Sequence, residues 1–179
     1  GDGLVLGETY QPLEKVGIYI PAGTAPLVST VYMTVLPAKI AGVKKIVLIS
    51  PPDKSGQINA HILAVANLLK VDEIYRVGGA QGVAALAYGT KTIPKVDKIV
   101  GPGNVYVTEA KRQVFGLVDI DMIAGPTELV IIANRFSDPK FIIADLKAQA
   151  EHAQGLAILI TNSKSLAKQV NLELAQVNG

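Results

Sequence analysis

The sequence alternates between short β-branched runs and longer amphipathic stretches, and this alternation limits the possible fold more than any other feature. Several runs are apolar at consecutive positions, as in Ile46-Val47-Leu48-Ile49. Continuous apolar runs are typical of strands that are covered on both faces, as in a parallel sheet. Strands that alternate with helices over short connections predict βαβ units with right-handed crossovers. The expected fold class is therefore α/β.

The pattern predicts six strands and six helices. The expected strands are 16–20, 45–49, 73–77, 98–100, 128–132 and 156–160. The expected helices are 27–41, 57–69, 81–88, 104–115, 139–152 and 165–176. Pro37 is expected to kink or interrupt the first helix, because proline removes a backbone donor.

A break between structural units is expected around residues 123–126. The four strand–helix units before it suffice for a compact three-layer domain. The two units after it are few for a sheet of their own. We expect them to pair with strands outside this chain or to extend the first sheet.

Composition excludes several classes of protein. Of the 179 residues, 49% are hydrophobic and 18% are charged, which allows a sizeable core and argues against disorder. The net charge is +2 and the basic residues are scattered, so no nucleic-acid groove is expected. The chain has no cysteine, and no apolar run approaches the ~20 residues that cross a bilayer. Without a visible signal peptide, we expect no membrane association and a cytoplasmic location.

Three glycine clusters follow predicted strands, at 21–26, 78–82 and 101–104. In open α/β sheets ligands bind at the carboxyl ends of the strands, where helix amino ends supply free N–H groups. Glycine at such a position either allows the turn or lets a ligand approach the backbone closely. For any single cluster these two interpretations are evenly balanced. Three clusters on one edge, two of them ending in Gln81 and Asn104, favour a phosphate- or nucleotide-like ligand. The G-x-G-x-x-G fingerprint is absent.

A second group of polar residues lies further along the chain. Gln149 and His152 are three residues apart on a predicted helix, so they share a face and could bind one metal ion. A lone histidine near a helix end is more often a surface residue, and a zinc site needs about four ligands. The other histidine, His61, is expected on a surface helix. Thr127, at a strand entry, could contact a substrate or simply complete a turn.

Taken together, several segments resemble the histidinol dehydrogenase family. The matching stretches are VGIYIPAGTAPLVSTVYM (16–33), PAKIAGVKKIVLISPP (37–52), VGGAQGVAALAYGT (77–90), PKVDKIVGPGNVYVTEAKRQV (94–114), IDMIAGPTELVII (120–132) and DLKAQAEH (145–152). They follow the family's order, and the block at 94–114 is highly specific. The resemblance implies a Rossmann-like three-layer α/β/α domain over 16–124 with a mostly parallel sheet. A segment 1–15 precedes it, and a partial second α/β domain covers 125–179.

The resemblance also implies a chemistry. Members of the family oxidise L-histidinol through the aldehyde to L-histidine, the last step of histidine biosynthesis, with two NAD molecules in succession. By position, Tyr19, Gln81 and Asn104 resemble the family's NAD contacts. Thr127 matches a substrate contact that is serine in some members. Gln149 and His152 match two zinc ligands that also hold the substrate.

One departure from the family concerns length. Members are much longer, and the glutamate–histidine pair that transfers protons, like the remaining zinc ligands, is expected beyond Gly179. The sequence therefore predicts no catalytic residue within this chain and no turnover of histidinol by it alone. The family also implies a homodimer. The alternatives are a non-catalytic nucleotide- or metabolite-binding module and a fragment that binds nothing.

Overall fold

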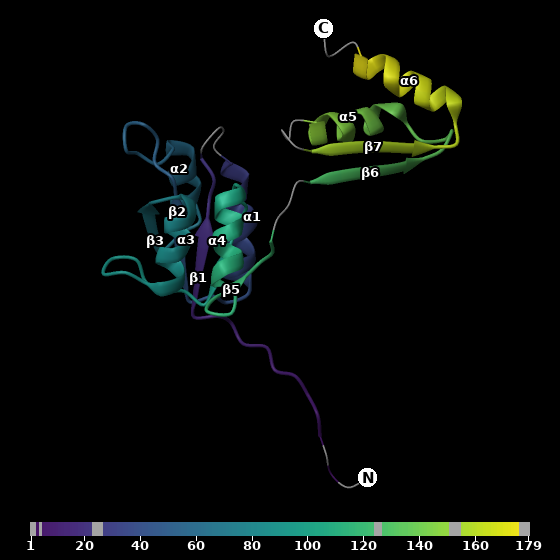
Figure 1. The fold of residues 1–179 in the computed structure, drawn as a ribbon. Helices are drawn as coiled ribbons and strands as arrows, with labels where there is room; N and C mark the ends of the chain where they lie inside the picture. The colour runs from purple at the N-terminus through teal and green to yellow at the C-terminus, as the bar shows by residue number, and fades with distance from the viewer. Residues whose placement is uncertain (1–2, 4, 23–26, 124–126, 151–154, 176–179) are drawn as a thin grey trace. The chain divides into compact units, whose positions relative to one another are not determined.

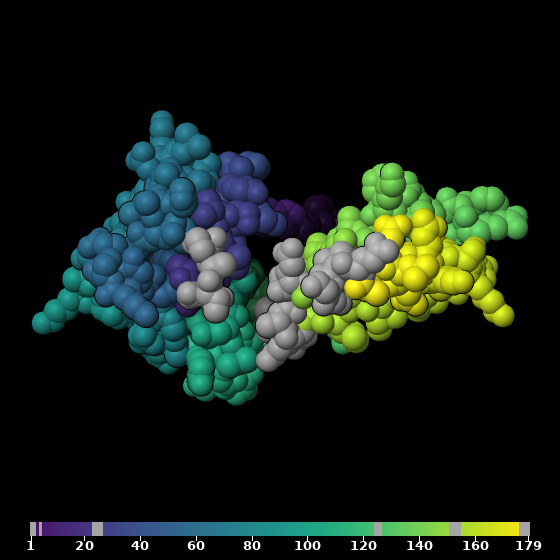
Figure 2. Space-filling view, turned by 90° about the horizontal axis from the view of Figure 1, so that it is seen from above, coloured from purple at the N-terminus to yellow at the C-terminus, as the bar shows by residue number. Residues whose placement is uncertain are grey.

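The computed structural model describes residues 3, 5–22, 27–123, 127–150 and 155–175. The chain divides into two compact units, Gly1–Ala124 and Gly125–Gly179, each with its own sheet (Figure 1). In the space-filling view the first unit is coloured from purple to green and the second from green to yellow (Figure 2). Each unit is described separately below.

The first unit contains five parallel strands in the order β3-β2-β1-β4-β5. Their bounds are β1 Lys15–Tyr19, β2 Lys45–Ser50, β3 Glu73–Arg76, β4 Lys98–Val100 and β5 Asp119–Ile120. In the register, Ile18 of β1 lies opposite both Leu48 and Val100. The predicted α/β class with a mostly parallel sheet is confirmed.

Helices cover both faces of this sheet. They are α1 Val28–Ile40, α2 Ala60–Leu68, α3 Gly79–Tyr88 and α4 Val105–Val114. Successive strand residues point to opposite faces, so β1 contributes to two cores. Ile18 belongs to a cluster with residues of α1 and α2, whereas Tyr19 belongs to a cluster with residues of α3 and α4. The result is three layers, as expected.

The structure differs from the sequence expectations in local details. α1 continues through Pro37 without interruption, and the carbonyl of Pro37 accepts the N–H of Ala41 at 2.9 Å. The buried side chains of Val31 and Val35 anchor this helix to the sheet, which offsets the one missing backbone bond. α2 begins three residues later than expected, because the side chain of Asn59 caps it.

The second unit has two layers. Its strands β6 (Glu128–Ala133) and β7 (Leu156–Thr161) pair in parallel along their whole length and form a sheet separate from the first one. The helices α5 (Pro139–Ala150) and α6 (Lys164–Ala175) share one core with the strands (Figure 1). The opposite sheet face carries exposed apolar side chains, namely Val130, Ile132, Leu156, Ile158 and Ile160. The two strands do not extend the first sheet, and their pairing with strands outside the chain stays a prediction.

None of the helices in the described ranges is long and apolar enough to cross a membrane.

Candidate functional site

The strand order of the first unit creates a switch point. From β1 the chain continues to β2 and β3 on one side, and β4 and β5 lie on the other. In open α/β sheets the crevice for a ligand lies outside the carboxyl ends of the strands where the order reverses. Here that point is between the ends of β1 and β4, at Tyr19 and Gly101. β1 points upward in Figure 1, so Figure 2 looks down on this edge.

Tyr19 links the end of β1 to the start of α3. Its side chain is buried at 4% exposure, and its hydroxyl accepts the N–H of Gly79 at 3.1 Å. Gly79 has φ +66°, a backbone conformation that costs glycine little and other residues more. The pair therefore fixes the first turn of α3 against β1.

Gln81 folds back over the same glycine. A Cβ placed on Gly79 would lie 2.7 Å from Oε1 of Gln81, so only the absence of a side chain lets the amide lie there. Tyr19 and Gln81, two of the three predicted cofactor residues, thus meet at Gly79. Gln81 is solvent-exposed, so its amide remains accessible to a ligand.

The N-cap residue of α3 supplies no capping side chain. This residue is Gly78, where a Cβ would lie 2.5 Å from Cβ of Pro51 in the neighbouring loop. The N–H of Gly79 is accepted by Tyr19, and the backbone N–H groups that follow it, together with the helix dipole, suit an anionic group. Free N–H groups and a glycine cradle are the features that a dinucleotide pyrophosphate needs.

Asn104, the third predicted cofactor residue, caps α4. Its Oδ1 accepts the N–H groups of Tyr106 and Val107, both at 3.1 Å. The carbonyl side of the amide is therefore occupied by a structural role, and its Nδ2 remains as a donor for a ligand. Asn104 follows β4, and β1 and β4 are adjacent parallel strands, so it lies on the same sheet edge as Tyr19.

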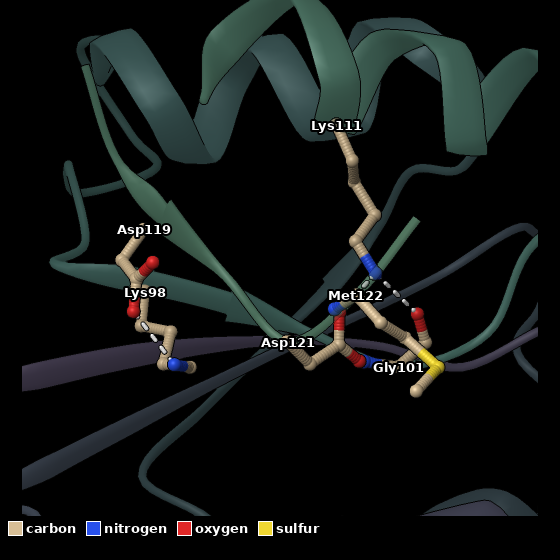
Figure 3. Close-up of polar contacts among 6 residues, drawn as sticks. All are labelled: Lys98, Gly101, Lys111, Asp119, Asp121 and Met122. Carbon is tan, nitrogen blue, oxygen red and sulfur yellow. Dashed lines mark hydrogen bonds and ion pairs between the residues drawn. The ribbon is translucent and has the colours of Figure 1, made fainter. Parts of the chain in front are cut away.

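Sequence reasoning missed two residues at this edge. Lys111 of α4 is 3% exposed, and its Nζ donates to the carbonyl of Gly101 at 3.0 Å and to the carboxylate of Asp121 (Figure 3). The sequence did carry a signal, because Lys111 occupies the buried stripe of α4 between Val107 and Val114. The scattered basic residues were weighed only against a nucleic-acid groove.

A second ion pair joins the strands β4 and β5 directly. Lys98 of β4 donates to Asp119 of β5 at 2.6 Å, with the two side chains 30% and 53% exposed (Figure 3). This hydrogen bond lowers the pKa of Asp119 below its usual value. Neither side chain hydrogen-bonds Gly101, so the pair bonds strand to strand without holding the loop.

In the second unit, Thr127 and Gln149 lie in contact. Nε2 of Gln149 donates to the carbonyl oxygen of Thr127 at 2.7 Å and to its hydroxyl oxygen at 3.0 Å. A carbonyl oxygen can only accept, so this contact determines which end of the amide faces Thr127. The third predicted residue of this group, His152, lies outside the described residues, as do residues 23–26 of the first glycine cluster.

Comparisons with known proteins identify the family of this chain. A family model described as histidinol dehydrogenase matches residues 1–178. The chain belongs to the histidinol dehydrogenase family. The histidinol dehydrogenase of Listeria innocua is 64% identical over 174 residues, and that of Bacillus cereus (strain ATCC 14579) is 58% identical over 173 residues. These matches cover 97% and 96% of the chain, respectively.

The fold is shared as well. A crystal structure of histidinol dehydrogenase from Elizabethkingia anophelis matches 93% of this chain with a TM-score of 0.89 and 48% sequence identity. The chain spans 40% of the length of the two curated histidinol dehydrogenases and 39% of the crystallised one. The family is one of oxidoreductases, and what the whole enzymes do is carried to this chain only as a proposal.

The described residues can be tested for their fit to the zinc ion that the family resemblance implies. Because Nε2 of Gln149 is held by Thr127, Oε1 is the end of the amide that remains to bind a cation. Gln149 therefore fits one ligand position. Within the described ranges, no group of three or more His, Cys, Asp or Glu side chains could complete the site. His61 is exposed at the start of α2, as expected for a surface residue.

Proposed function

We propose that the protein containing this chain oxidises L-histidinol to L-histidine with NAD. The alcohol carbon loses a hydride and its oxygen loses a proton, which yields the aldehyde. Water then adds to the aldehyde, and loss of a second hydride and proton yields the carboxylic acid. The observation that carries the proposal is the convergence of Tyr19, Gln81 and Asn104 on one sheet edge at the strand-order reversal.

The proposed cofactor role follows from the groups that this edge offers. NAD, when bound, supplies the hydride acceptor. The amino end of α3 would receive the anionic pyrophosphate at the backbone N–H groups that follow Gly79, because its N-cap residue has no capping side chain. Gln81 and Nδ2 of Asn104 would donate to the polar edges of the dinucleotide. The buried Tyr19 would keep the start of α3 in place through Gly79.

The proposed substrate role belongs to the second unit. The hydroxyl of Thr127 would contact a polar group of histidinol, and Gln149 and His152 would hold zinc and through it the substrate. The anchored amide of Gln149 supports this role, because its free oxygen is already oriented before a cation binds. A substrate held in one orientation loses less entropy when it reacts.

We further propose that the 179 residues alone do not turn over histidinol. The described residues supply too few ligands for a closed zinc site, and the chain spans 40% of its curated relatives. For the whole protein we propose, from its family, that it is a homodimeric cytoplasmic enzyme. We propose that it also supplies the remaining zinc ligands and the proton-transferring pair.

The test is an assay that follows NADH formation with L-histidinol and zinc, run in parallel on this chain and on a polypeptide of the relatives' full length that contains it. Turnover by the long polypeptide alone is the expected result. Its loss in the Gln149→Ala variant would support the role of the second unit. Turnover by the 179 residues would disprove the inactivity proposal, and a long polypeptide that binds NAD without oxidising histidinol would point instead to a non-catalytic binding module.

A further inference from the structure

Lys111 is an unusual residue for the inner stripe of a helix. It is 3% exposed and has the buried Val107 and Val114 as neighbours on the same face of α4. Removing an ammonium group from water is strongly unfavourable unless its partners compensate. An apolar side chain would fill this position without that penalty, so the contacts of the ammonium group indicate what it does.

Those contacts meet at one residue. Nζ of Lys111 donates to the carbonyl of Gly101 at 3.0 Å, and Oδ2 of Asp121 accepts the N–H of Gly101 at 2.8 Å. Lys111 and Asp121 also bond to each other (Figure 3). A single ion pair therefore satisfies both backbone polar groups of Gly101, one from each partner.

Gly101 is also the residue at which the chain leaves β4. Its φ is +112°, and a Cβ there would lie 2.2 Å from the carbonyl oxygen of Tyr19. The backbone of the loop thus lies against the end of β1 at a distance and in a conformation that only glycine accommodates. The direction taken by Gly101 determines where the next residues, including Asn104, begin α4.

We propose that Lys111 and Asp121 are positioning residues, which hold the Gly101–Asn104 loop in the shape that binds the dinucleotide. The inference rests on the proposed function, because it assumes that NAD occupies this edge. Neither side chain touches the cofactor in this role. They act through the backbone of Gly101. The pair Lys98–Asp119, which joins β4 to β5, does not share the role.

The experiment compares four forms of the 179-residue chain: wild type, Lys111→Met, Lys111→Arg and Lys98→Met. NAD is titrated against the backbone amide signals of Gly101 and Asn104, and amide hydrogen exchange is measured across the sheet of the first unit. Lys111→Met removes the ammonium group and keeps an unbranched side chain. Lys111→Arg retains a cationic donor, and Lys98→Met removes the matched ion pair.

We expect Lys111→Met to weaken NAD binding about tenfold, the effect of losing a charged hydrogen bond that holds a binding loop. Amide exchange should accelerate at Gly101, Gly103 and Asn104 and stay unchanged in β1 and β2. Lys111→Arg should recover part of the affinity, and Lys98→Met should stay within about twofold of wild type.

The positioning role is overturned if Lys111→Met binds NAD like wild type, if Lys98→Met loses as much affinity, or if exchange accelerates across the whole sheet. A wild-type chain that does not bind millimolar NAD contradicts the proposed cofactor edge itself, and the positioning role is rejected with it. If the wild type binds NAD and Lys111→Met binds it equally well, only the positioning role is rejected.

Discussion

The amide of Gln149 donates to both oxygens of Thr127, at 2.7 Å to the carbonyl and at 3.0 Å to the hydroxyl. The contact joins the last turn of α5 to the residue that precedes β6. It ties two residues predicted to act on the same substrate, and it leaves Oε1 of Gln149 as the end of the amide for a cation.

The first prediction concerns this contact. Gln149→Glu places a carboxylate opposite the Thr127 carbonyl, and a carboxylate cannot donate a hydrogen bond. We therefore expect the free energy of unfolding of the second unit to fall by about 1 kcal/mol at pH 7. Thr127→Ser retains both oxygens and should be nearly neutral. Amide exchange in β6 and β7 of the full chain measures the difference, and equal protection in Gln149→Glu and wild type would contradict it.

Gly101→Ala is expected to be among the most destabilising substitutions in the first unit. It adds a Cβ at 2.2 Å from the Tyr19 carbonyl to a backbone at φ +112°, and we expect a loss of more than about 2 kcal/mol in urea unfolding. Gly116→Ala is the control, because Gly116 has φ +97° with open space around it. That variant should lose only about 1 kcal/mol from backbone strain. Similar losses in both would show that the close approach at Gly101 is relaxed in solution.

Tyr19→Phe removes the acceptor for the Gly79 N–H and keeps the buried ring. We expect a loss of about 1 kcal/mol in stability, because a part-buried donor is left without its partner. NAD affinity should fall a few-fold, since the start of α3 is less well held. Tyr88→Phe is the control, because Tyr88 ends the same helix and is 67% exposed, and it should change neither stability nor NAD affinity. A Tyr19→Phe chain with wild-type affinity would limit this hydroxyl to a role in folding.

Asn104 can be separated into its two roles. Asn104→Ser keeps a capping oxygen for α4 and loses the Nδ2 donor, so it should fold like wild type and bind NAD more weakly. Asn104→Ala removes both the capping oxygen and the Nδ2 donor, and we expect it to lower stability by about 1 kcal/mol. Asn59→Ala, which removes the cap of α2, controls for capping and should leave NAD binding unchanged. Full affinity in Asn104→Ser would show that Asn104 is only a cap.

The ion pair at the start of β3 predicts a pH dependence. Hydrogen bonds from Lys45 and then from Tyr75 lower the pKa of Glu73 below its usual 4.5. A carboxyl group whose pKa is lower in the folded state adds stability above pH 4.5, and this contribution disappears as the pH falls through the folded value. Glu73→Gln should therefore destabilise the first unit by about 1 kcal/mol or less at pH 7, since the carboxyl side chain is 29% exposed, and the gap should close in acid.

Urea unfolding of wild type and Glu73→Gln at several pH values tests this dependence. Glu14→Gln is the matched control, because the Glu14–Lys44 pair is 65% and 64% exposed and should contribute nothing measurable. A difference between Glu73→Gln and wild type that stays constant from pH 7 to strongly acidic solution would contradict the lowered pKa.

The sequence by itself determined the alternation of strands and helices and the edge on which the glycine clusters gather. Continuous apolar runs such as 46–49, bounded by turn residues, favour strands buried on both faces, and each glycine cluster directly follows a predicted strand. The six expected strands and six expected helices all exist, because local periodicity and turn residues define them. β5 was missed because a strand of two residues has no measurable period.

Only the tertiary structure decided the strand order, the partners of the polar residues and the position of Lys111. Pairing of β1 with β4 joins residues about eighty positions apart, and no local pattern specifies which strands become neighbours. Whether a lysine on an apolar stripe reaches solvent or turns inward depends on what lies opposite it. Here Asp121 and the carbonyl of Gly101 provide acceptors, and they make burial of the charge possible.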